Sequence, residues 1–507
     1  MQIFNVGEMF AGVGGFRLGL EGVPHEFWEN EFLKVEETGF KVIWSNQWEP
    51  GSKKQWASEI YTERFGEKGH FNEDIHNFTK NKKNTERIPN LDLLVGGFPC
   101  QDYSVARTKS GEMGVKGEKG KLWTPIWQII SRSHKNKTQQ RPKMVLLENV
   151  PRLLNSPANA RGLNFAVILK KLLSMSYEVE WRVINAENFG FPQKRKRVFI
   201  IAYRTDRGND KTIIQRNGFG HYGLEGVKEG NNNMMEMWMF GESDRSKKEK
   251  SKIGPFGRSF PTNFSSLVTD MELPEPGFWD YKKSPFGDAG YAWKGKKDGR
   301  NWVNQFSSWK TSPIKTEKTS IRDIMVKKGD LEYNDKYEVN KKDLADWKYE
   351  KGAKKEFRIR KVDLTRYQNL SDIYIECKKS KSQKKWDEHK DKFKEILGEN
   401  GSYSYTEGAI SLHDCIDKPS RTIVTSEIGK SASRMRHLIK LDDGTFRTLF
   451  PIETERLNMF PDNWTKFRDI SDSQRGFLMG NALVIGIIKK LSKPIYEILQ
   501  EKSAIDK

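Results

Sequence analysis

The sequence predicts an α/β fold, in which a mostly parallel sheet carries helices on both faces. Two observations lead to this fold class. Short apolar runs alternate with stretches of helical periodicity over the first two hundred residues, which is the pattern of repeated βαβ units. Glycine-rich or polar turns follow several of these apolar runs, as expected where a strand ends. With 507 residues, of which 36% are hydrophobic, the chain can bury such a core.

The individual elements follow from the same patterns. We expect buried strands at residues 6–10, 41–45, 91–95, 144–147 and 198–203, because these runs are short and rich in aliphatic residues. Helices are expected between them, at 53–64, 123–133 and 165–174. Parallel strands joined through helices place all their carboxyl ends at one edge of the sheet, where ligands bind in open α/β folds.

The βαβ rhythm stops near residue 205, which divides the chain into three parts. Residues 1–204 form the expected α/β domain, and residues 205–462 form a second domain that includes a large insert over about 205–410. Lysines interleave with tryptophans in this insert. Residues 463–507 contain a glycine turn and an apolar helix, so we expect them to rejoin the first domain.

Composition and charge restrict the class of protein. The chain has 88 Lys and Arg against 68 Asp and Glu, a net charge of +20, and a mean hydropathy of −0.76. No apolar run is long enough to span a bilayer, and the N-terminus lacks the features of a secretory signal. A cytoplasmic protein with a polyanionic partner such as nucleic acid is therefore expected. Any single lysine run is also explained by a solvated face.

A glycine cluster follows the first expected strand. Glycines occupy positions 12, 14 and 15, directly after Phe10, and allow a tight strand-to-helix turn in which backbone approaches a ligand. The cluster is not Gly-x-Gly-x-x-Gly, so a pyrophosphate site is not indicated, and a simple packing turn remains an alternative. Polar residues that could meet a ribose follow the second strand, at Asn46-Gln47-Trp48-Glu49, and Glu73-Asp74-Ile75 marks a further junction.

Groups that carry chemistry follow the later strands. Cys100 lies in Gly-Gly-Phe-Pro-Cys-Gln (96–101), on a turn at the functional edge, where a nucleophilic thiolate is a better interpretation than an inert buried cysteine. Glu148 closes an apolar strand, where a carboxyl group is costly unless it is hydrogen-bonded or functional. Arg195 and Arg197 are two residues apart and would point the same way from an extended segment.

The order of these motifs resembles the cytosine-C5 DNA methyltransferase family of bacterial and phage restriction–modification systems. The matching segments are Phe-Ala-Gly-Val-Gly-Gly (10–15), Gly-Gly-Phe-Pro-Cys-Gln (96–101), Glu-Asn-Val (148–150), Gln-Lys-Arg-Lys-Arg (193–197), Pro-Ser-Arg-Thr-Ile (419–423), Arg-Leu-Asn-Met-Phe-Pro-Asp (456–462) and Gly-Asn-Ala-Leu-Val (480–484). The resemblance implies a Rossmann-like, S-adenosyl-L-methionine-dependent domain and a smaller, irregular target-recognition domain. Double-stranded DNA would be the partner, with the target cytosine flipped out of the helix.

The resemblance also assigns roles to residues. Catalysis would rest on Cys100, Glu148, Arg195 and Arg197, with Cys100 attacking C6 of the cytosine and S-adenosyl-L-homocysteine as product. The cofactor would be bound by Phe10, Gly12, Gly14, Gly15, Gln47, Trp48, Asp74, Ile75, Pro99, Leu122, Asn481, Ala482 and Leu483. The substrate would be bound by Phe98, Gln101, Ser104 and Gln193. No metal is expected, because the sequence shows no metal-ligand spacing.

Two positions depart from the family, and two alternatives remain open. Gln47 stands where the family usually has a ribose-binding acid, and Glu8 stands where it has an aspartate. One alternative is a transfer-RNA cytosine-C5 methyltransferase, although relatives of that kind have a short recognition region. The other is a non-catalytic DNA-binding relative, which should have lost Cys100 or Glu148. We expect a monomer, with a cognate restriction endonuclease acting on the same sequence.

Overall fold

The computed structural model describes residues 1–23, 38–98, 123–131, 141–205, 254–297, 301–314, 316–359, 389, 395, 402–429 and 431–505. The chain divides into two compact units. The large unit comprises Met1–Glu332, Ile416–Ile428 and Phe450–Lys507, and the small unit comprises Tyr333–Cys415 and Gly429–Leu449. Each unit is described by itself.

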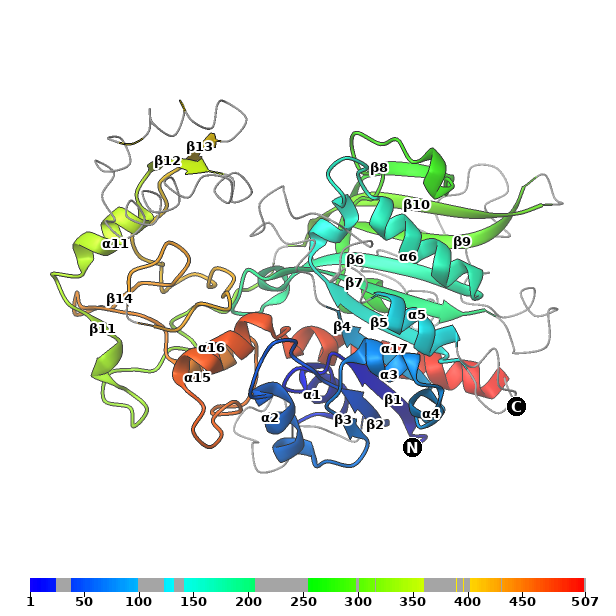
Figure 1. Cartoon of the computed structure of the whole chain (residues 1–507), viewed down its shortest axis with the longest axis horizontal. Coiled ribbons are helices and arrows are strands. Elements are labelled where there is room, and N and C mark those ends of the chain that lie inside the picture. The colour runs from blue at the N-terminus through cyan, green and yellow to red at the C-terminus, as the bar shows by residue number, and fades with distance from the viewer. Residues whose placement is uncertain are drawn as a thin grey trace. The chain divides into compact units, whose positions relative to one another are not determined.

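A single sheet organises the large unit (Figure 1). Its described strands lie in the order β3-β2-β1-β4-β5-β7-β6-β9-β10-β8. Neighbours from β3 to β5 pair in parallel, and neighbours from β5 to β8 pair antiparallel. The strands are β1 (Phe4–Met9), β2 (Phe40–Asn46), β3 (His70–Phe71), β4 (Leu93–Gly97), β5 (Met144–Asn149), β6 (Tyr177–Asn185), β7 (Lys196–Arg204), β8 (Thr262–Glu272), β9 (Ala289–Lys297) and β10 (Asn301–Pro313).

The α/β fold class is confirmed. Each of the five expected strands is present, with bounds that differ by no more than two residues at either end. The expected helices are also found, as α2 (Trp56–Phe65), α5 (Trp123–Ser131) and α6 (Leu163–Ser174). Their apolar residues form two cores, one on each face of the sheet.

One core lies under α1 (Gly15–Glu21), α10 (Pro255–Ser259) and α17 (Ile485–Ile505), and contains Phe16, Phe256 and Ile488. The other lies under α3 (Ile75–Lys80), α5 and α6, and contains Phe78, Ile126 and Phe165. Burial of these side chains is the main favourable contribution to the fold. The sheet therefore presents one free edge for function, at the carboxyl ends of β1, β2, β4 and β5.

The remaining elements of the large unit are short connections. They are α4 (Lys82–Glu86), α15 (Pro451–Leu457), α16 (Asp472–Asn481) and the 3₁₀ turns η7 (Pro151–Asn155), η8 (Ala186–Phe189) and η10 (Pro276–Phe278). Among the described residues of the large unit, no helix is long and apolar enough to cross a membrane, and the same holds for the small unit.

The small unit has its own sheets and its own buried residues. Strands β11 (Glu338–Val339), β15 (Phe446–Arg447) and β14 (Ile439–Lys440) form one sheet, and β12 (Lys354–Ile359) pairs with β13 (Ser402–Glu407). The 3₁₀ turn η11 (Asp335–Tyr337) precedes β11, and α11 (Leu344–Lys351) lies between β11 and β12. Trp347 and Leu438 are fully buried.

The compact units do not divide at the boundaries expected from the sequence. Residues 254–332 belong to the large unit, because β9 pairs with β6 and brings β10 and β8 into the same sheet. The returning segment also begins earlier than residue 463, at Phe450. The expected domain over 205–462 is thus reduced, as a separate body, to Tyr333–Cys415 and Gly429–Leu449.

Candidate active site

The turn between β1 and α1 has an unusual backbone. Phe10, Gly12 and Gly14 adopt positive φ angles of 53°, 56° and 90°, whereas Ala11 and Val13 between them do not. Alternation of this kind turns successive N–H groups toward one side and makes a concave binding surface. Positive φ costs little at glycine, but at Phe10 it is a strained conformation. The sequence therefore specifies a shaped loop at this position.

Neighbouring side chains close this turn on one side and leave it open on another. A Cβ atom on Gly14 would lie 2.3 Å from the ring of Phe65, and one on Gly15 would lie 3.2 Å from Leu483. Among the residues that the structure describes, no atom would lie within 4 Å of a Cβ on Gly12. The open side of the turn is thus at Gly12, which is where a ligand could approach the backbone.

The end of β2 holds the turn in place. The backbone N–H of Ala11 donates to the Asn46 carbonyl at 3.1 Å, and that of Gly12 donates to Oε1 of Gln47 at 2.8 Å. Gln47 is 7% exposed. Its amide therefore takes a structural role at the position where the family usually has a ribose-binding acid.

The next two residues differ in exposure. Trp48 is exposed. Burial raises the pKa of the Glu49 carboxyl group above its ordinary value, and the side chain of Gln55 hydrogen-bonds both the N–H and the carbonyl of Glu49. This clamp fixes the backbone at Glu49, one of the polar residues that the sequence predicts could meet a ribose.

The junction after β3 places Asp74 and Ile75 in different roles. Asp74 caps α3, and its Oδ1 accepts from the N–H of His76 at 2.8 Å and of Asn77 at 3.3 Å. Ile75 is buried in the core. Asn46 donates to the Glu73 carbonyl at 2.9 Å, which fixes this junction beside the glycine turn.

A buried carboxyl group lies at the base of the turn. Glu8 is fully buried in β1, and it accepts from the Tyr61 hydroxyl at 3.0 Å and from the Arg17 N–H at 3.3 Å. Burial raises its pKa to about 7, although Tyr61 and Arg17 oppose the rise. The Arg17 guanidinium pairs with Glu21 at 2.8 Å. These contacts join the strand before the turn to the helix after it.

A half-buried histidine extends this polar network. The two ring nitrogens of His70 lie 2.8 Å from Ser45 Oγ and 2.7 Å from Ser58 Oγ. The ring stacks on Tyr61 with centroids 4.6 Å apart. Burial lowers the pKa of His70 to about 4, and the Arg17 charge acts in the same direction. His70 is therefore neutral at pH 7 and ties β2 and α2 together.

The carboxyl end of β5 carries an ion pair. Oε1 of Glu148 lies 2.9 Å from Nε of Arg197, and both side chains are mostly buried. Arg197 reaches this edge because β7 runs antiparallel to β5, so the start of β7 lies beside the end of β5. A Cβ on Gly97 would lie 3.2 Å from Oε2 of Glu148, so the glycine leaves room for this carboxylate.

Phe98 is placed next to this pair by its backbone. Its carbonyl accepts from Nδ2 of Asn149 at 3.1 Å, and the same asparagine accepts from the Val150 N–H at 2.8 Å. A carbonyl oxygen has two lone pairs, so Phe98 retains the capacity to accept a second hydrogen bond.

Gln193 and Arg195, which belong to the same Gln-Lys-Arg-Lys-Arg segment as Arg197, point into the protein. Gln193 is fully buried and contacts Leu457, Asn458 and Ile423 through its amide. Arg195 is 2% exposed and donates to the carbonyls of Ile423 and Gly480. Arg195 and Arg197 thus do not share one environment, and Gln193 and Arg195 hold the C-terminal segment against β7 in this structure.

The C-terminal cofactor candidates lie at the end of α16. Asn481 is exposed, Ala482 is half-buried and Leu483 is buried against Gly15. The segment that the sequence predicted to rejoin the first domain therefore contacts the glycine turn directly.

Several predicted site residues lie outside the described residues. They are Pro99, Cys100, Gln101, Ser104 and Leu122. No cluster of three or more metal-ligating side chains occurs among the residues that the structure describes.

Three residues near the turn were not identified from the sequence. Tyr61 and His70 belong to the polar network at the base of the turn, and their hydrogen bonds join residues that are distant in the sequence, so they leave no local pattern. Trp464 donates its indole N–H to the Val13 carbonyl at 2.9 Å. A signal for Trp464 was present, since it follows the Arg-Leu-Asn-Met-Phe-Pro-Asp motif by two residues.

The fold and this edge define a Rossmann-like methyltransferase: a parallel half-sheet with a shaped glycine turn after β1 and a glutamate–arginine pair after β5. The sequence places the chain in one family of that class. The model of the C-5 cytosine-specific DNA methylase family matches residues 4–263 and 290–497. The chain belongs to this family and is a DNA cytosine-C5 methyltransferase.

Two Type II methyltransferases agree with this assignment. The chain is 34% identical to the Type II methyltransferase M.Sau3AI of Staphylococcus aureus over 507 residues, covering 98% of this chain and 97% of that protein. It is 33% identical to the Type II methyltransferase M.BsuFI of Bacillus subtilis over 211 residues, covering 41% of this chain and 42% of that protein. The solved structure of the Entamoeba histolytica methyltransferase EhMeth aligns over 98% of this chain and 99% of that chain, with a TM-score of 0.46 and 12% identity.

Proposed function

We propose that this enzyme methylates C5 of a flipped cytosine in a specific duplex sequence, through a covalent bond between Cys100 and C6 of the base. The observation that supports this most directly is the Glu148–Arg197 pair at 2.9 Å. It lies on the sheet edge that also carries the glycine turn. The base must leave the stack, because C5 and C6 cannot be reached inside a duplex.

The glycine turn fits the cofactor that the family implies, S-adenosyl-L-methionine. The open space at Gly12 admits a ligand to the backbone, and the exposed Trp48 and the half-buried Glu49 follow the adjacent strand. Phe10, Gln47, Asp74, Ala482 and Leu483 would shape the site from neighbouring elements. When bound, the cofactor supplies a methyl group on a sulfonium, which is an electrophile.

The chain's own residues would activate the base. Cytosine C5 is a poor nucleophile until a thiolate adds to C6 and N3 is protonated. Cys100 would supply the thiolate, and Glu148 would hold the proton at N3. Arg197 would orient the Glu148 carboxyl group and contact O2, and the free lone pair of the Phe98 carbonyl would accept from the cytosine amino group. A base then removes the C5 proton, and Cys100 leaves as the thiolate.

The small unit is proposed to read the DNA sequence. Over Tyr333–Cys415 and Gly429–Leu449 it carries 24 Lys and Arg against 18 Asp and Glu, a charge balance that suits a polyanion. The described part of 254–332 continues the central sheet instead. We therefore place the readout in the small unit, within the region that the sequence reasoning assigned to recognition.

A methyl-transfer assay tests the proposed chemistry and substrate together. The full chain is incubated with tritiated cofactor and either duplex DNA or transfer RNA. Label is expected in the DNA and not in the RNA, and denatured complexes of DNA containing 5-fluorocytosine should retain the protein through a covalent bond. Cys100→Ser should reduce turnover to below about a hundredth, because a hydroxyl is a far weaker nucleophile than a thiolate. Label in transfer RNA alone would overturn the proposal.

A segment exchange tests the assignment of sequence readout. Replacing the small unit with the corresponding segment of a relative should change which cytosines are methylated, as read by sequencing treated DNA. Replacing residues 254–313 serves as the matched control and should leave the methylated sequence unchanged. An altered sequence in the control alone would place the readout in the sheet extension.

The setting of the enzyme follows from its relatives. Both relatives described above are Type II methyltransferases, which supports a restriction–modification system, with a cognate endonuclease that cuts the same unmethylated sequence in the cytoplasm. We propose that the enzyme acts as a monomer. Sedimentation of the full chain with and without duplex DNA would test this, since a dimer at working concentration would contradict it.

A further inference from the structure

The segment around Trp464 lies against the glycine turn and has a strained backbone. Among the described residues, five that are not glycine adopt positive φ: Phe10, Ser176, Met459, Asn463 and Arg468. One of them belongs to the glycine turn and three to the segment 459–468. Strained backbone persists where the surroundings determine it fully, and it gathers at functional sites. The two segments that carry this strain also contact each other.

Trp464 makes that contact through a hydrogen bond that the turn needs. Val13 immediately precedes Gly14, the N-cap residue of α1. Its carbonyl therefore lies outside the hydrogen bonds of the helix. Val13 is 3% exposed, and a buried carbonyl without a partner costs free energy. The fully buried Trp464 indole donates to it at 2.9 Å. The donor and the acceptor are 451 residues apart in the sequence.

Aromatic packing holds the indole in this orientation. Its ring lies 5.5 Å from Phe65 and 6.4 Å from Phe460, measured between centroids. Phe65 is the ring that leaves no room for a Cβ on Gly14, and Phe460 lies against Gly15. The rings that pack on the indole therefore fill the space beside Gly14 and Gly15, whereas the open position of the turn is at Gly12.

An arginine of α2 fixes the backbone on either side of Trp464. The Arg64 guanidinium donates to the carbonyls of Trp464 and Lys466 at 3.0 and 3.1 Å, and to that of Asn463 at 3.3 Å. It also lies over the indole ring, 5.4 Å from its centroid. Arg64 thus holds the strained turn that carries Trp464 against α2.

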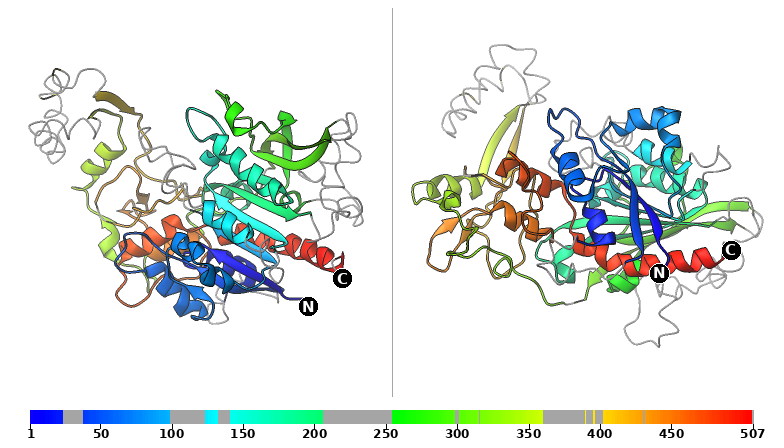
Figure 2. Two further views of the ribbon diagram at one scale, coloured as in Figure 1. Left: turned by 45° about the vertical axis from the view of Figure 1, so that its right-hand side comes forward. Right: turned by 90° about the horizontal axis from the view of Figure 1, so that it is seen from below.

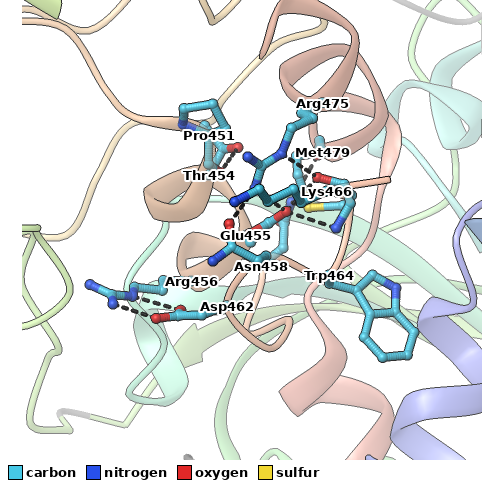
Figure 3. Close-up of polar contacts among 12 residues, drawn as sticks. Pro451, Thr454, Glu455, Arg456, Asn458, Asp462, Trp464, Lys466, Arg475 and Met479 are labelled. Atoms are coloured by element: carbon cyan, nitrogen blue, oxygen red, sulfur yellow. Dashed lines mark hydrogen bonds and ion pairs between the residues drawn. The ribbon is translucent and has the colours of Figure 1, made fainter. Parts of the chain in front are cut away.

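A buried ion pair anchors the same segment from its other side (Figure 3). Arg475 of α16 donates to Glu455 of α15 at 2.9 Å, and Glu455 also accepts from the N–H of Thr465, at 2.9 Å, and from its hydroxyl. Arg475 further contacts Asn463 at 3.2 Å. Charged groups are buried in this way only when they are paired, so the conformation of 463–465 is fixed before any ligand binds.

We infer that Trp464 is a positioning residue for the cofactor. Its indole N–H holds the Val13 carbonyl and so keeps the glycine turn in the conformation that leaves Gly12 open. This inference rests on the proposed binding of S-adenosyl-L-methionine at that turn. Trp464 acts on the turn through the Val13 backbone.

The test is Trp464→Phe, which keeps an aromatic ring but removes the N–H donor. Binding of S-adenosylhomocysteine to the full chain is measured by titration calorimetry, and thermal unfolding is measured in parallel. A hydrogen bond contributes about 0.5–1.5 kcal/mol net, so we expect the Kd to rise by about three- to tenfold. The KM for the cofactor should rise likewise, with the Kd for DNA unchanged.

Trp181→Phe is the matched control. Trp181 is also fully buried in the large unit and donates its indole N–H to a backbone carbonyl, that of Gly287, at 3.3 Å. Loss of that bond should lower the unfolding temperature without changing the Kd for S-adenosylhomocysteine. A purely structural role for Trp464 would give the same result in both variants, and that result would overturn the inference.

A second variant keeps the inference testable if Trp464→Phe folds poorly. Arg64→Met retains an apolar side chain over the indole but removes the hydrogen bonds to the carbonyls of Asn463, Trp464 and Lys466. Its Kd should rise in the same direction, and its effect should be smaller when Trp464→Phe is already present, because Arg64 acts through Trp464. Fully additive effects would overturn the inference. A wild-type chain that binds no S-adenosylhomocysteine would instead overturn the proposed cofactor site.

Discussion

The two halves of the central sheet use similar polar residues for different purposes. In the parallel half, from β3 to β5, the strands end at one edge, and Gln47, Phe98 and Glu148 all lie there. In the antiparallel half, from β7 to β8, strand ends alternate between edges, so no common edge forms. Strand direction, and not residue type, determines which polar groups reach the site.

Buried polar side chains of the antiparallel half form hydrogen bonds with other strands of the sheet. Glu178 accepts from the Tyr291 hydroxyl at 2.6 Å, and Glu180 accepts from that of Tyr203 at 2.7 Å. Arg182, on the same face of β6, donates to Thr262 at 2.9 Å. Burial raises the pKa of Tyr203 well above its ordinary value, so its hydroxyl keeps the proton that it donates. We expect changes here to affect stability and changes in the parallel half to affect function.

The largest effect is expected from Glu148→Gln in the parallel half. The amide matches the shape of the carboxyl group but cannot supply the N3 proton, so kcat should fall by about 10²–10⁴-fold. Cofactor affinity should change little. Glu180→Gln is the matched control in the antiparallel half, and its kcat per folded molecule should equal that of the wild type. A loss below about tenfold in Glu148→Gln would show that the proton comes from another group.

The next effect concerns the pH dependence of stability at Glu8. Its pKa is raised to about 7, so between its unfolded pKa and pH 7 the folded state binds more protons than the unfolded state. Stability from this group is therefore present at low pH and is lost as pH rises through 7. Relative to Glu8→Gln, the wild type should lose up to about 3 kcal/mol of unfolding free energy between pH 5 and pH 8. Urea unfolding at both pH values measures this, and a pH-independent difference would contradict it.

In the antiparallel half, Tyr203→Phe should reduce stability without changing catalysis. Removing the hydroxyl deprives the fully buried Glu180 of its 2.7 Å donor, which costs about 1–3 kcal/mol of unfolding free energy. Urea denaturation reports the stability, and kcat is measured well below the transition. A fall in kcat for the folded enzyme would remove the distinction between the two halves.

The smallest effect is expected at His70, and its sign is opposite to that at Glu8. The pKa of His70 is lowered to about 4, so the unfolded state binds a proton first as the pH falls below about 6.5. The stability contributed by His70 is present above that pH and is lost toward pH 4. Relative to His70→Gln, the wild type should become less stable on acidification, as followed by thermal unfolding from pH 7 to pH 5. The opposite trend would mean that His70 is protonated in the folded state.

Strands β1, β2, β4 and β5 of the parallel half were predicted from the sequence, whereas in the antiparallel half only β7 was predicted. Strands β1, β2, β4 and β5 are continuous apolar runs followed by motif residues, and such runs are visible without tertiary information. Strand β6 alternates Glu178, Glu180 and Arg182 with apolar residues. Such alternation is typical of a strand with one solvent-exposed face. These three charged side chains are nevertheless buried, and tyrosines of neighbouring strands donate hydrogen bonds to the two glutamates. Strands β8 to β10 are rich in polar residues, and the sequence pattern therefore predicts that they belong to the recognition domain.

The candidate site shows the same limit. Its motif residues are short-range signals, and the sequence located the glycine turn and Glu148 from them. The Glu8–Tyr61 and Trp464–Val13 hydrogen bonds span 53 and 451 residues. Contacts of that separation depend on the completed fold, so no local pattern announces them. The hydrogen bond that Gln47 accepts from the Gly12 N–H likewise depends on the geometry of the fold, and the motif alone does not reveal it.

The packing of helix α17 joins two parts of the chain that are made at different times. Helix α17 covers the same face of the sheet as α1 (Figure 2), and Ile488 fills the space at Gly19. The Tyr496 hydroxyl also donates to the carbonyl of Gln2 at 3.1 Å. During synthesis, β1 and α1 leave the ribosome before α17. At about 5–20 residues per second this interval is on the order of one minute. Over that time we expect the apolar face of the nascent sheet to stay uncovered by α17 and open to chaperones.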